Sequence, residues 1–222
     1  EIGLNEIFVL VDVPIATNGS VSEDNELNNE ANNSFTVGQF NIIAGTTNDE
    51  LRITDASYIS LFEWSDVNLT DSNVYASDTD SVITWSELQA ISRNTTNGST
   101  NNDFEEMDAA FGSTNYTDSM NNTYTSGGSP IATQTFTVFS SDILNTPIVN
   151  STNTSDFVTG ILWDYSDGNV EYNGTQDLVF ITKINENKTG QYGTYDYEIK
   201  VPALLRNYKG GTETVTFYTE IN

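Results

Sequence analysis

The chain has 222 residues, with 7 Lys and Arg against 32 Asp and Glu, and it contains neither cysteine nor histidine. The formal net charge of −25 argues against nucleic acid or anionic lipid as a partner, because no basic patch is available to neutralise phosphates. Without cysteine and histidine, the sequence excludes a disulfide framework, thiolate or imidazole zinc sites, and Ser-His-Asp or Cys-His catalysis. Carboxylate-only chemistry remains, but no carboxylate pair stands out for it, so we expect a protein that is not an enzyme.

Short alternating segments predict one large all-β domain. A single domain of this class accommodates the length, and the period of two is typical of strands with one buried face. We therefore expect an antiparallel β-sandwich, of jelly-roll or immunoglobulin-like topology, over residues 34–222. The predicted strands are residues 34–43, one or two strands within 51–64, then 134–140, 156–163, 177–184, 195–201 and 214–221.

Residues 81–130 depart from the strand period, and we interpret them as an insertion into the β domain. The first predicted helix, at residues 81–92, has its apolar residues on one helical face and a T-x-x-E capping-box pattern that begins at Thr84. The second, at residues 103–111, can be capped by Asp103. The apolar stripe of this second helix consists of Phe104, Met107 and Phe111.

An apolar strand stands at the N-terminal end of the chain, ahead of a polar segment. Residues 6–15 alternate, and the following residues, 17–33, are too polar to bury a core. We therefore divide the chain into a strand at 1–16, a tether at 17–33 and the domain at 34–222. The strand can complete the sheet of its own domain or that of a neighbouring subunit, and the sequence leaves both open. The residues on its apolar face are Ile7, Val9, Val11, Val13 and Ile15.

Several features predict a secreted protein. The chain opens on Glu1, which we expect to follow a cleaved leader, and no apolar run approaches the length of a membrane helix. It also carries eleven Asn-x-Ser/Thr sequons, the acceptor motif for N-linked glycans, which are typical of surface loops in secreted proteins. The sequon asparagines are Asn18, Asn32, Asn68, Asn94, Asn97, Asn115, Asn121, Asn150, Asn153, Asn173 and Asn187.

One acidic stretch, residues 76–88, partly matches an EF-hand loop. Asp78 and Asp80 fall at the third and fifth ligand positions and Glu87 at the bidentate twelfth. The match departs at the first position, which is Ala76, and at the sixth, which is Ser81 instead of glycine. Weak Ca²⁺ binding by these carboxylates and the Val82 carbonyl is one interpretation. A polar turn that caps a helix is the other.

Other polar and aromatic clusters have ordinary structural explanations. The turn with Asp164, Asp167, Asn169 and Glu171 surrounds Gly168, and Asp-Gly first of all indicates a hairpin turn. The carboxylates at Asp103, Glu105, Glu106 and Asp108 share one predicted helix, where such a cluster usually forms a solvated face. The many tyrosines and tryptophans are compatible with a sugar-stacking platform, as in carbohydrate-binding modules, but cross-strand packing also explains them.

The layout resembles that of extracellular filament subunits. The chain combines an apolar N-terminal strand, a long tether, a β domain with strand-then-helix stretches such as ISLFEW and ITWSELQAIS, and a closing pair of alternating strands. This order of elements resembles that of archaeal thread proteins, bundling pilins and the TasA/camelysin-like family. The resemblance implies a homopolymer in which the strand of one subunit fills a groove in the next. The alternative is a surface domain that forms no filament: an adhesin, a carbohydrate-binding module, a surface-layer protein or a viral spike protein.

Overall fold

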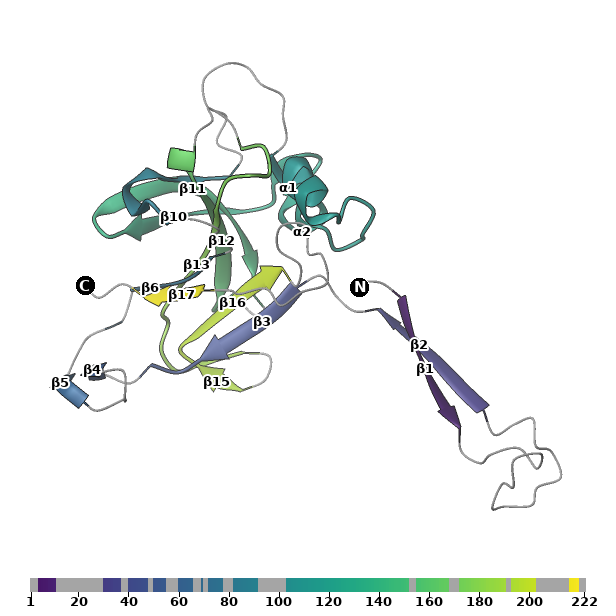
Figure 1. Cartoon of the computed structure of the whole chain (residues 1–222), viewed down its shortest axis with the longest axis horizontal. Helices are drawn as coiled ribbons and strands as arrows, with labels where there is room; N and C mark the ends of the chain where they lie inside the picture. Colours follow the sequence, from purple (N-terminus) through teal and green to yellow (C-terminus); the bar gives the residue numbers. More distant parts are fainter. Residues whose placement is uncertain are drawn as a thin grey trace. The chain divides into compact units, whose positions relative to one another are not determined.

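The computed structural model is mostly β, and every strand pairing is antiparallel (Figure 1). It forms two compact units, residues 1–39 and residues 40–222, and each is described by itself. The residues that the structure describes are 4–10, 30–36, 40–47, 50–54, 60–65, 69, 72–77, 82–91, 103–151, 155–167, 172–190, 193–202 and 216–219.

A seven-stranded antiparallel sheet organises the larger unit. Its strands follow the order β10-β11-β12-β13-β6-β17, and β7 joins it by pairing with β12. The predicted strands at 134–140, 156–163 and 177–184 are confirmed as β10, β12 and β13. The seven strands are β6 (Asn73–Ser77), β7 (Leu88–Ala90), β10 (Thr133–Val138), β11 (Ser141–Asn150), β12 (Val158–Asp164), β13 (Leu178–Lys183) and β17 (Thr216–Thr219).

Both faces of the two central strands, β12 and β13, are buried, which explains their nearly continuous apolar sequences. Trp163 and Phe180 belong to one core cluster, whereas their neighbours Leu162 and Val179 belong to another. The alternation therefore separates two apolar layers. At Gly160 the sheet leaves no room for a side chain, since a Cβ there would lie 2.8 Å from the Phe136 ring.

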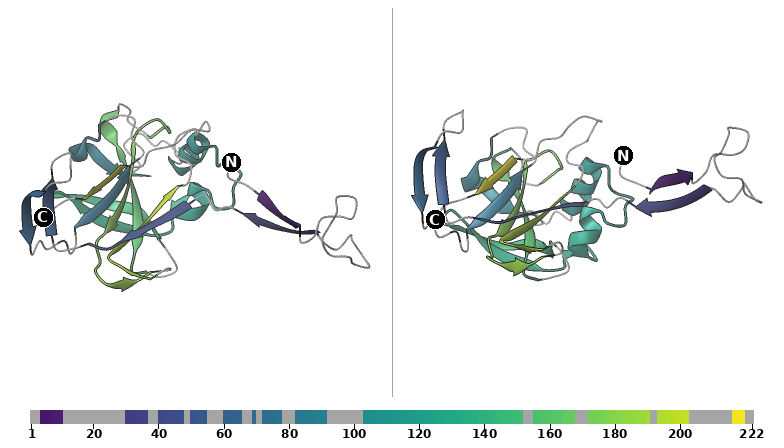
Figure 2. Two further views of the ribbon diagram at one scale, coloured as in Figure 1. Left: turned by 60° about the horizontal axis from the view of Figure 1, so that its bottom comes forward. Right: turned by 90° about the horizontal axis from the view of Figure 1, so that it is seen from below.

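Two helices and a second ladder contribute to the first core cluster. The helices are α1 (Asp103–Phe111), which confirms the second predicted helix, and the unexpected α2 (Met120–Tyr124). Figure 2 shows them side by side at one end of the larger unit. The ladder pairs β3 (Phe40–Gly45) with β16 (Tyr197–Pro202), and β16 packs against β12, β13 and β6.

Smaller ladders complete the described part of the larger unit. Each has two strands and, within the described ranges, pairs with no strand of the seven-stranded sheet. They are β4 (Glu50–Thr54) with β5 (Ser60–Ser65), β8 (Thr125–Ser126) with β9 (Ser129–Pro130), and β14 (Lys188–Thr189) with β15 (Thr194–Tyr195).

The first predicted helix is wrong. A single 3₁₀ turn, η3 (Trp85–Glu87), leads directly into β7, and the Thr84 side chain makes no capping hydrogen bond. The cause lies elsewhere in the chain: the buried Asp164 accepts a hydrogen bond from the Thr84 N–H at 2.6 Å. This bond and the pairing of β7 with β12 outweigh the local helical pattern.

The last two predicted strands both form, but in the described residues they pair with other strands and not with each other. β16 pairs with β3, and β17 pairs with β6. The segment that connects them, residues 203–215, lies outside the described residues. The chain thus closes by returning to two early strands, which gives the larger unit long-range contacts from its end to its beginning.

The smaller unit contains one ladder, between β1 (Leu4–Leu10) and β2 (Glu30–Thr36). β1 overlaps the predicted N-terminal strand, while Val11, Val13 and Ile15 lie outside the described residues. β2 begins within the segment expected to be a tether. The N-terminal strand therefore pairs with a strand of its own chain, which the polar sequence after it did not indicate.

Candidate functional site

The register of the β1–β2 ladder places apolar residues of β1 opposite polar residues of β2. Directly opposed pairs of an antiparallel ladder share a face of the sheet, and apolar or aromatic pairs stabilise such ladders. Val9 opposite Ala31 is the one pair in which both residues are apolar. The pairs that combine an apolar residue of β1 with a polar residue of β2 are Leu4 with Thr36, Ile7 with Asn33, Phe8 with Asn32 and Leu10 with Glu30.

The EF-hand-like stretch contains strands where an EF-hand has helices. Ala76, at its first ligand position, lies in β6 and is fully buried, and Glu87, at its last, is exposed at the end of η3. Asp78 and Asp80 lie outside the described residues. Within the described ranges, no group of three or more carboxylates is placed to hold a metal ion. Calcium binding at this stretch stays a prediction.

The second acidic turn has a structural role in its described part. Asp164 is buried and accepts hydrogen bonds from the Ser166 N–H at 2.9 Å and the Ser166 hydroxyl at 2.7 Å, in addition to the bond from Thr84. Asp167 accepts one from the Asp177 N–H at 2.9 Å. These carboxylates tie η3 and the start of β13 to the end of β12. Asn169 and Glu171 lie outside the described residues.

The carboxylates of α1 do not all form a solvated face, so that interpretation is wrong for two of them. Asp103 and Asp108 are buried, while Glu105 is exposed and Glu106 half-buried. Asp108 accepts hydrogen bonds from the Met120 N–H at 2.6 Å, the Asn121 N–H at 3.1 Å and the Ser113 hydroxyl at 2.9 Å. Its carboxylate thus serves the N-terminus of α2, where backbone N–H groups need acceptors.

A further buried carboxylate, which the sequence pattern did not single out, is Asp196. It accepts hydrogen bonds from the Thr47 N–H at 2.6 Å, the Thr47 hydroxyl at 3.2 Å and the Asn187 N–H at 2.8 Å. Burial raises its pKa, but the hydrogen bonds from the Asn187 and Thr47 backbone and from the Thr47 side chain outweigh burial and lower the pKa overall. Asp196 therefore joins three loops as an ionised group.

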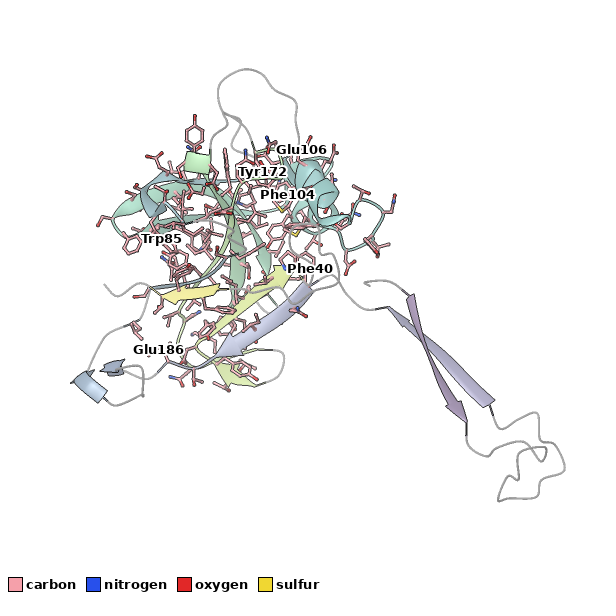
Figure 3. The ribbon with its side chains drawn as sticks, viewed as in Figure 1. Phe40, Trp85, Phe104, Glu106, Tyr172 and Glu186 are labelled. Carbon is pink, nitrogen blue, oxygen red and sulfur yellow. The ribbon has the colours of Figure 1, made fainter. Side chains whose placement is uncertain are left out.

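An aromatic cluster surrounds Trp85, on the opposite side of the sheet from Phe104 (Figure 3). Tyr75, Tyr218 and Phe139 each meet the Trp85 ring edge-on, with centroids 5.0, 5.1 and 5.8 Å away. Tyr75 is buried, but Phe139 is 53% exposed. The cluster is thus partly core packing and partly open to solvent, and sugar stacking on it stays a prediction.

The sequons differ in accessibility. Asn115, Asn150, Asn173 and Asn187 are exposed, whereas Asn121 lies in α2 and is half-buried. The backbone of Asn32 lies in β2, but its side chain is outside the description. Asn18, Asn68, Asn94, Asn97 and Asn153 lie outside the described residues altogether.

Comparison of the chain with protein-family models, with curated proteins and with solved structures found no match. In the part of the chain that the structure describes, no helix has the length and apolar character needed to cross a membrane.

Proposed function

We propose that the chain is a structural subunit of an extracellular, glycosylated cell-surface filament. Each subunit would add its N-terminal strand to the β domain of the next subunit. The observation that carries this proposal is the β1–β2 register, in which Ile7, Phe8 and Leu10 have polar partners. A two-stranded ladder is at best marginally stable in water, and this one has a single apolar cross-strand pair, Val9 with Ala31, to strengthen it. Pairing of β1 with an apolar groove of another subunit would therefore be more stable than its pairing with β2.

The physical requirements of such a contact are met by the sequence. Residues 6–15, fully extended, span about 33 Å, which is long enough for a complete strand position. Main-chain hydrogen bonds would supply affinity, and alternate side chains would set the register. Because donor and acceptor are different surfaces, the contact does not close on itself and propagates as a filament. The charge of −25 would keep neighbouring filaments apart.

For the β domain we propose the two-layer sandwich that was expected from the sequence. Its support is the packing of the β3–β16 ladder against β12, β13 and β6 of the seven-stranded sheet. Ile199 and Val201 of β16 belong to the same core cluster as Trp163 and Phe180. This arrangement is what two packed antiparallel layers require.

The filament proposal is tested by electron microscopy of the full chain and of a chain lacking residues 1–16. We expect fibres from the full chain, none from the truncated chain, and saturable binding of a synthetic peptide of residues 1–16 to the truncated chain. Fibres from a folded truncated chain would contradict the proposal. So would a full chain that remains monomeric at every concentration tested.

The aromatic cluster supports a second candidate, a carbohydrate-binding surface domain. Phe139 and Trp85 offer apolar ring surface near solvent, and such rings stack against sugars. On this alternative, Trp85→Ala weakens retention on insoluble polysaccharide, and deletion of residues 1–16 leaves retention unchanged. The filament proposal expects the deletion to act on assembly and Trp85→Ala to act on stability alone.

We also keep Ca²⁺ as a proposed ligand of Asp78, Asp80 and Glu87. Calcium bound only to the folded state would stabilise it by RT ln(1 + [Ca²⁺]/Kd), so the melting temperature would rise with the calcium concentration. The test is the melting temperature with calcium and with a chelator, for the natural chain and for Asp80→Asn. If calcium changes the melting temperature of neither chain, residues 76–88 form a polar turn and not a calcium site.

A further inference from the structure

The turn before β13 holds the Asn173-Gly174-Thr175 sequon in a defined conformation. The Oδ1 atom of Asn173 accepts two hydrogen bonds from Thr175, one from the backbone N–H at 3.2 Å and one from the hydroxyl at 2.6 Å. The first of these forms an Asx-turn. The Asn173 N–H in turn donates to Oε1 of the buried Gln176 at 2.9 Å. The acceptor asparagine and the hydroxyl residue of its own sequon are thus already in contact.

The middle residue of this sequon anchors the turn against α1. Gly174 has a φ of +84°, which favours glycine, and a Cβ there would lie 2.9 Å from Ala110 Cβ and 3.2 Å from the Glu106 backbone oxygen. The preceding Tyr172 is buried in the same core cluster as Phe104 of α1 and meets the Trp163 ring edge-on (Figure 3). The turn is therefore fixed to the core, although Asn173 and Thr175 themselves are exposed.

The Nδ2 atom of Asn173 is available for reaction with a transferase's substrate. Among the described residues, none accepts a hydrogen bond from it, while Oδ1 accepts two. Two donors on the amide oxygen draw electron density from the amide group, and so they favour loss of a proton from its nitrogen. This is the atom that bears the sugar in an N-linked glycan.

Asn121 provides the contrast within the same chain. Its Oδ1 accepts the hydroxyl of Thr125 at 2.8 Å, not that of its own sequon residue Thr123. Thr123 is held in α2, since its N–H donates to the Ser119 oxygen at 2.9 Å. The Asn121 N–H donates to Asp108. A transferase could use this sequon only after local unfolding of α2.

From these contacts we infer that Asn173 is a preformed N-glycosylation site and that Asn121 is not glycosylated in the folded chain. The co-substrate is a polyprenyl-pyrophosphate-linked oligosaccharide, brought by a separate oligosaccharyltransferase. Nδ2 attacks the anomeric carbon, an N–C bond forms, and the C–O bond to the pyrophosphate breaks. The pyrophosphate leaves with the electron pair, and the amide proton passes to a base of the transferase.

This inference rests on the extracellular location in the proposed function, but not on filament formation. The experiment uses the folded, unglycosylated full chain, a purified oligosaccharyltransferase and a polyprenyl-pyrophosphate-linked oligosaccharide. Occupancy of each sequon is measured by mass spectrometry of glycopeptides. The same reaction is run on the chain unfolded in urea at a concentration that the transferase tolerates, or on proteolytic peptides. Because assembly is not measured, failure here leaves the filament proposal untouched, and the reverse also holds.

In the folded chain we expect Asn173 to be occupied at least about tenfold more than Asn121, because Asn121 must first unfold locally. In the peptides we expect the difference to disappear. Equal occupancy of the two sites in the folded chain would overturn the inference. So would an unmodified Asn173 in the folded chain when its peptide is modified.

A variant separates the conformation of the turn from the sequon itself. Gly174→Ala keeps the Asn-x-Thr motif but places a methyl group against Ala110 and disfavours the positive φ. We expect it to lower occupancy of Asn173 in the folded chain several-fold and to leave the peptide reaction unchanged. The matched control is Lys188→Ala, which changes the middle residue of the Asn187 sequon. It should leave the occupancy of Asn187 unchanged in the folded chain and in the peptide. Unchanged or raised occupancy of Asn173 in folded Gly174→Ala would count against the inference. If this variant unfolds, the comparison of Asn173 with Asn121 in the natural chain still tests it.

Discussion

The Asp108 carboxylate lies 2.6 Å from the backbone nitrogen of Met120, and this hydrogen bond joins the end of α1 to the beginning of α2. The same carboxylate also accepts the Asn121 N–H and the Ser113 hydroxyl. Asp108 thus bonds α1 to the N-terminus of α2, beside the apolar contacts between the two helices.

Asp108→Ala is expected to lower the free energy of unfolding by about 1–3 kcal/mol, because it leaves buried N–H groups without an acceptor. The urea concentration at the midpoint of unfolding measures the change. Glu106→Gln, which removes one charge from the same helix, is the control and should shift the midpoint little. Equal midpoints for Asp108→Ala and the natural chain would show that α2 is held without this carboxylate.

The lowered pKa of Asp196 makes stability sensitive to acid. The ordinary value is 3.8, and the folded state keeps the group ionised below that pH. The stabilisation is therefore complete above the unfolded pKa and is lost as the pH falls through the lower, folded pKa. The measurement is the urea concentration at the midpoint of unfolding as a function of pH. Asp196→Asn should reduce the fall of this midpoint at acid pH, whereas Asp156→Asn, an exposed control, should leave the fall unchanged. Parallel acid limbs for Asp196→Asn and the natural chain would exclude this role.

Tyr124 is buried against Phe104, and none of the described residues hydrogen-bonds to its hydroxyl. Burial raises its pKa far above the ordinary value of 10.0. Stability should therefore fall as the pH rises above the unfolded value, because the phenol ionises only in the unfolded chain. Tyr124→Phe should leave stability unchanged or raise it by about 1 kcal/mol near neutral pH, and should remove part of the alkaline loss. A strongly destabilised Tyr124→Phe would point to a partner for the hydroxyl.

Local patterns in the sequence predicted those elements whose structure is decided locally. The stripe of Phe104, Met107 and Phe111 predicted α1, and the apolar run at residues 156–163 predicted the strand β12. The same kind of pattern failed at Trp85, because the deciding bond comes from Asp164, 80 residues from Thr84 in the chain. Long-range bonds of this kind leave no periodic signal.

The buried carboxylates show the same limit. Asp108 lies among acidic residues of an amphipathic helix, and the alternating pattern around Asp196 predicts a solvent-exposed position for it. Both carboxylates are buried in the structure. Their acceptor roles depend on N–H groups at the start of α2 and in the loops at Thr47 and Asn187, which only the fold brings close. The sequons, by contrast, are local motifs, yet their accessibility is again a property of the fold.

The central claim is that β1 leaves its own β2 to pair with a neighbouring subunit, and a reversible lock tests it most directly. Val9 and Ala31 are directly opposed in the ladder, and the natural chain has no cysteine, so Val9→Cys with Ala31→Cys permits one disulfide across it. Val9→Ser with Ala31→Ser is the matched control that cannot be locked.

The measurement is the amount of sedimentable fibre formed by the Cys pair before and after reduction. We predict that the oxidised chain stays monomeric, that reduction restores fibres, and that the serine pair forms fibres under both conditions. Fibres formed equally well by the oxidised and the reduced chain would contradict the claim, because β1 would then assemble, or be dispensable, without leaving β2.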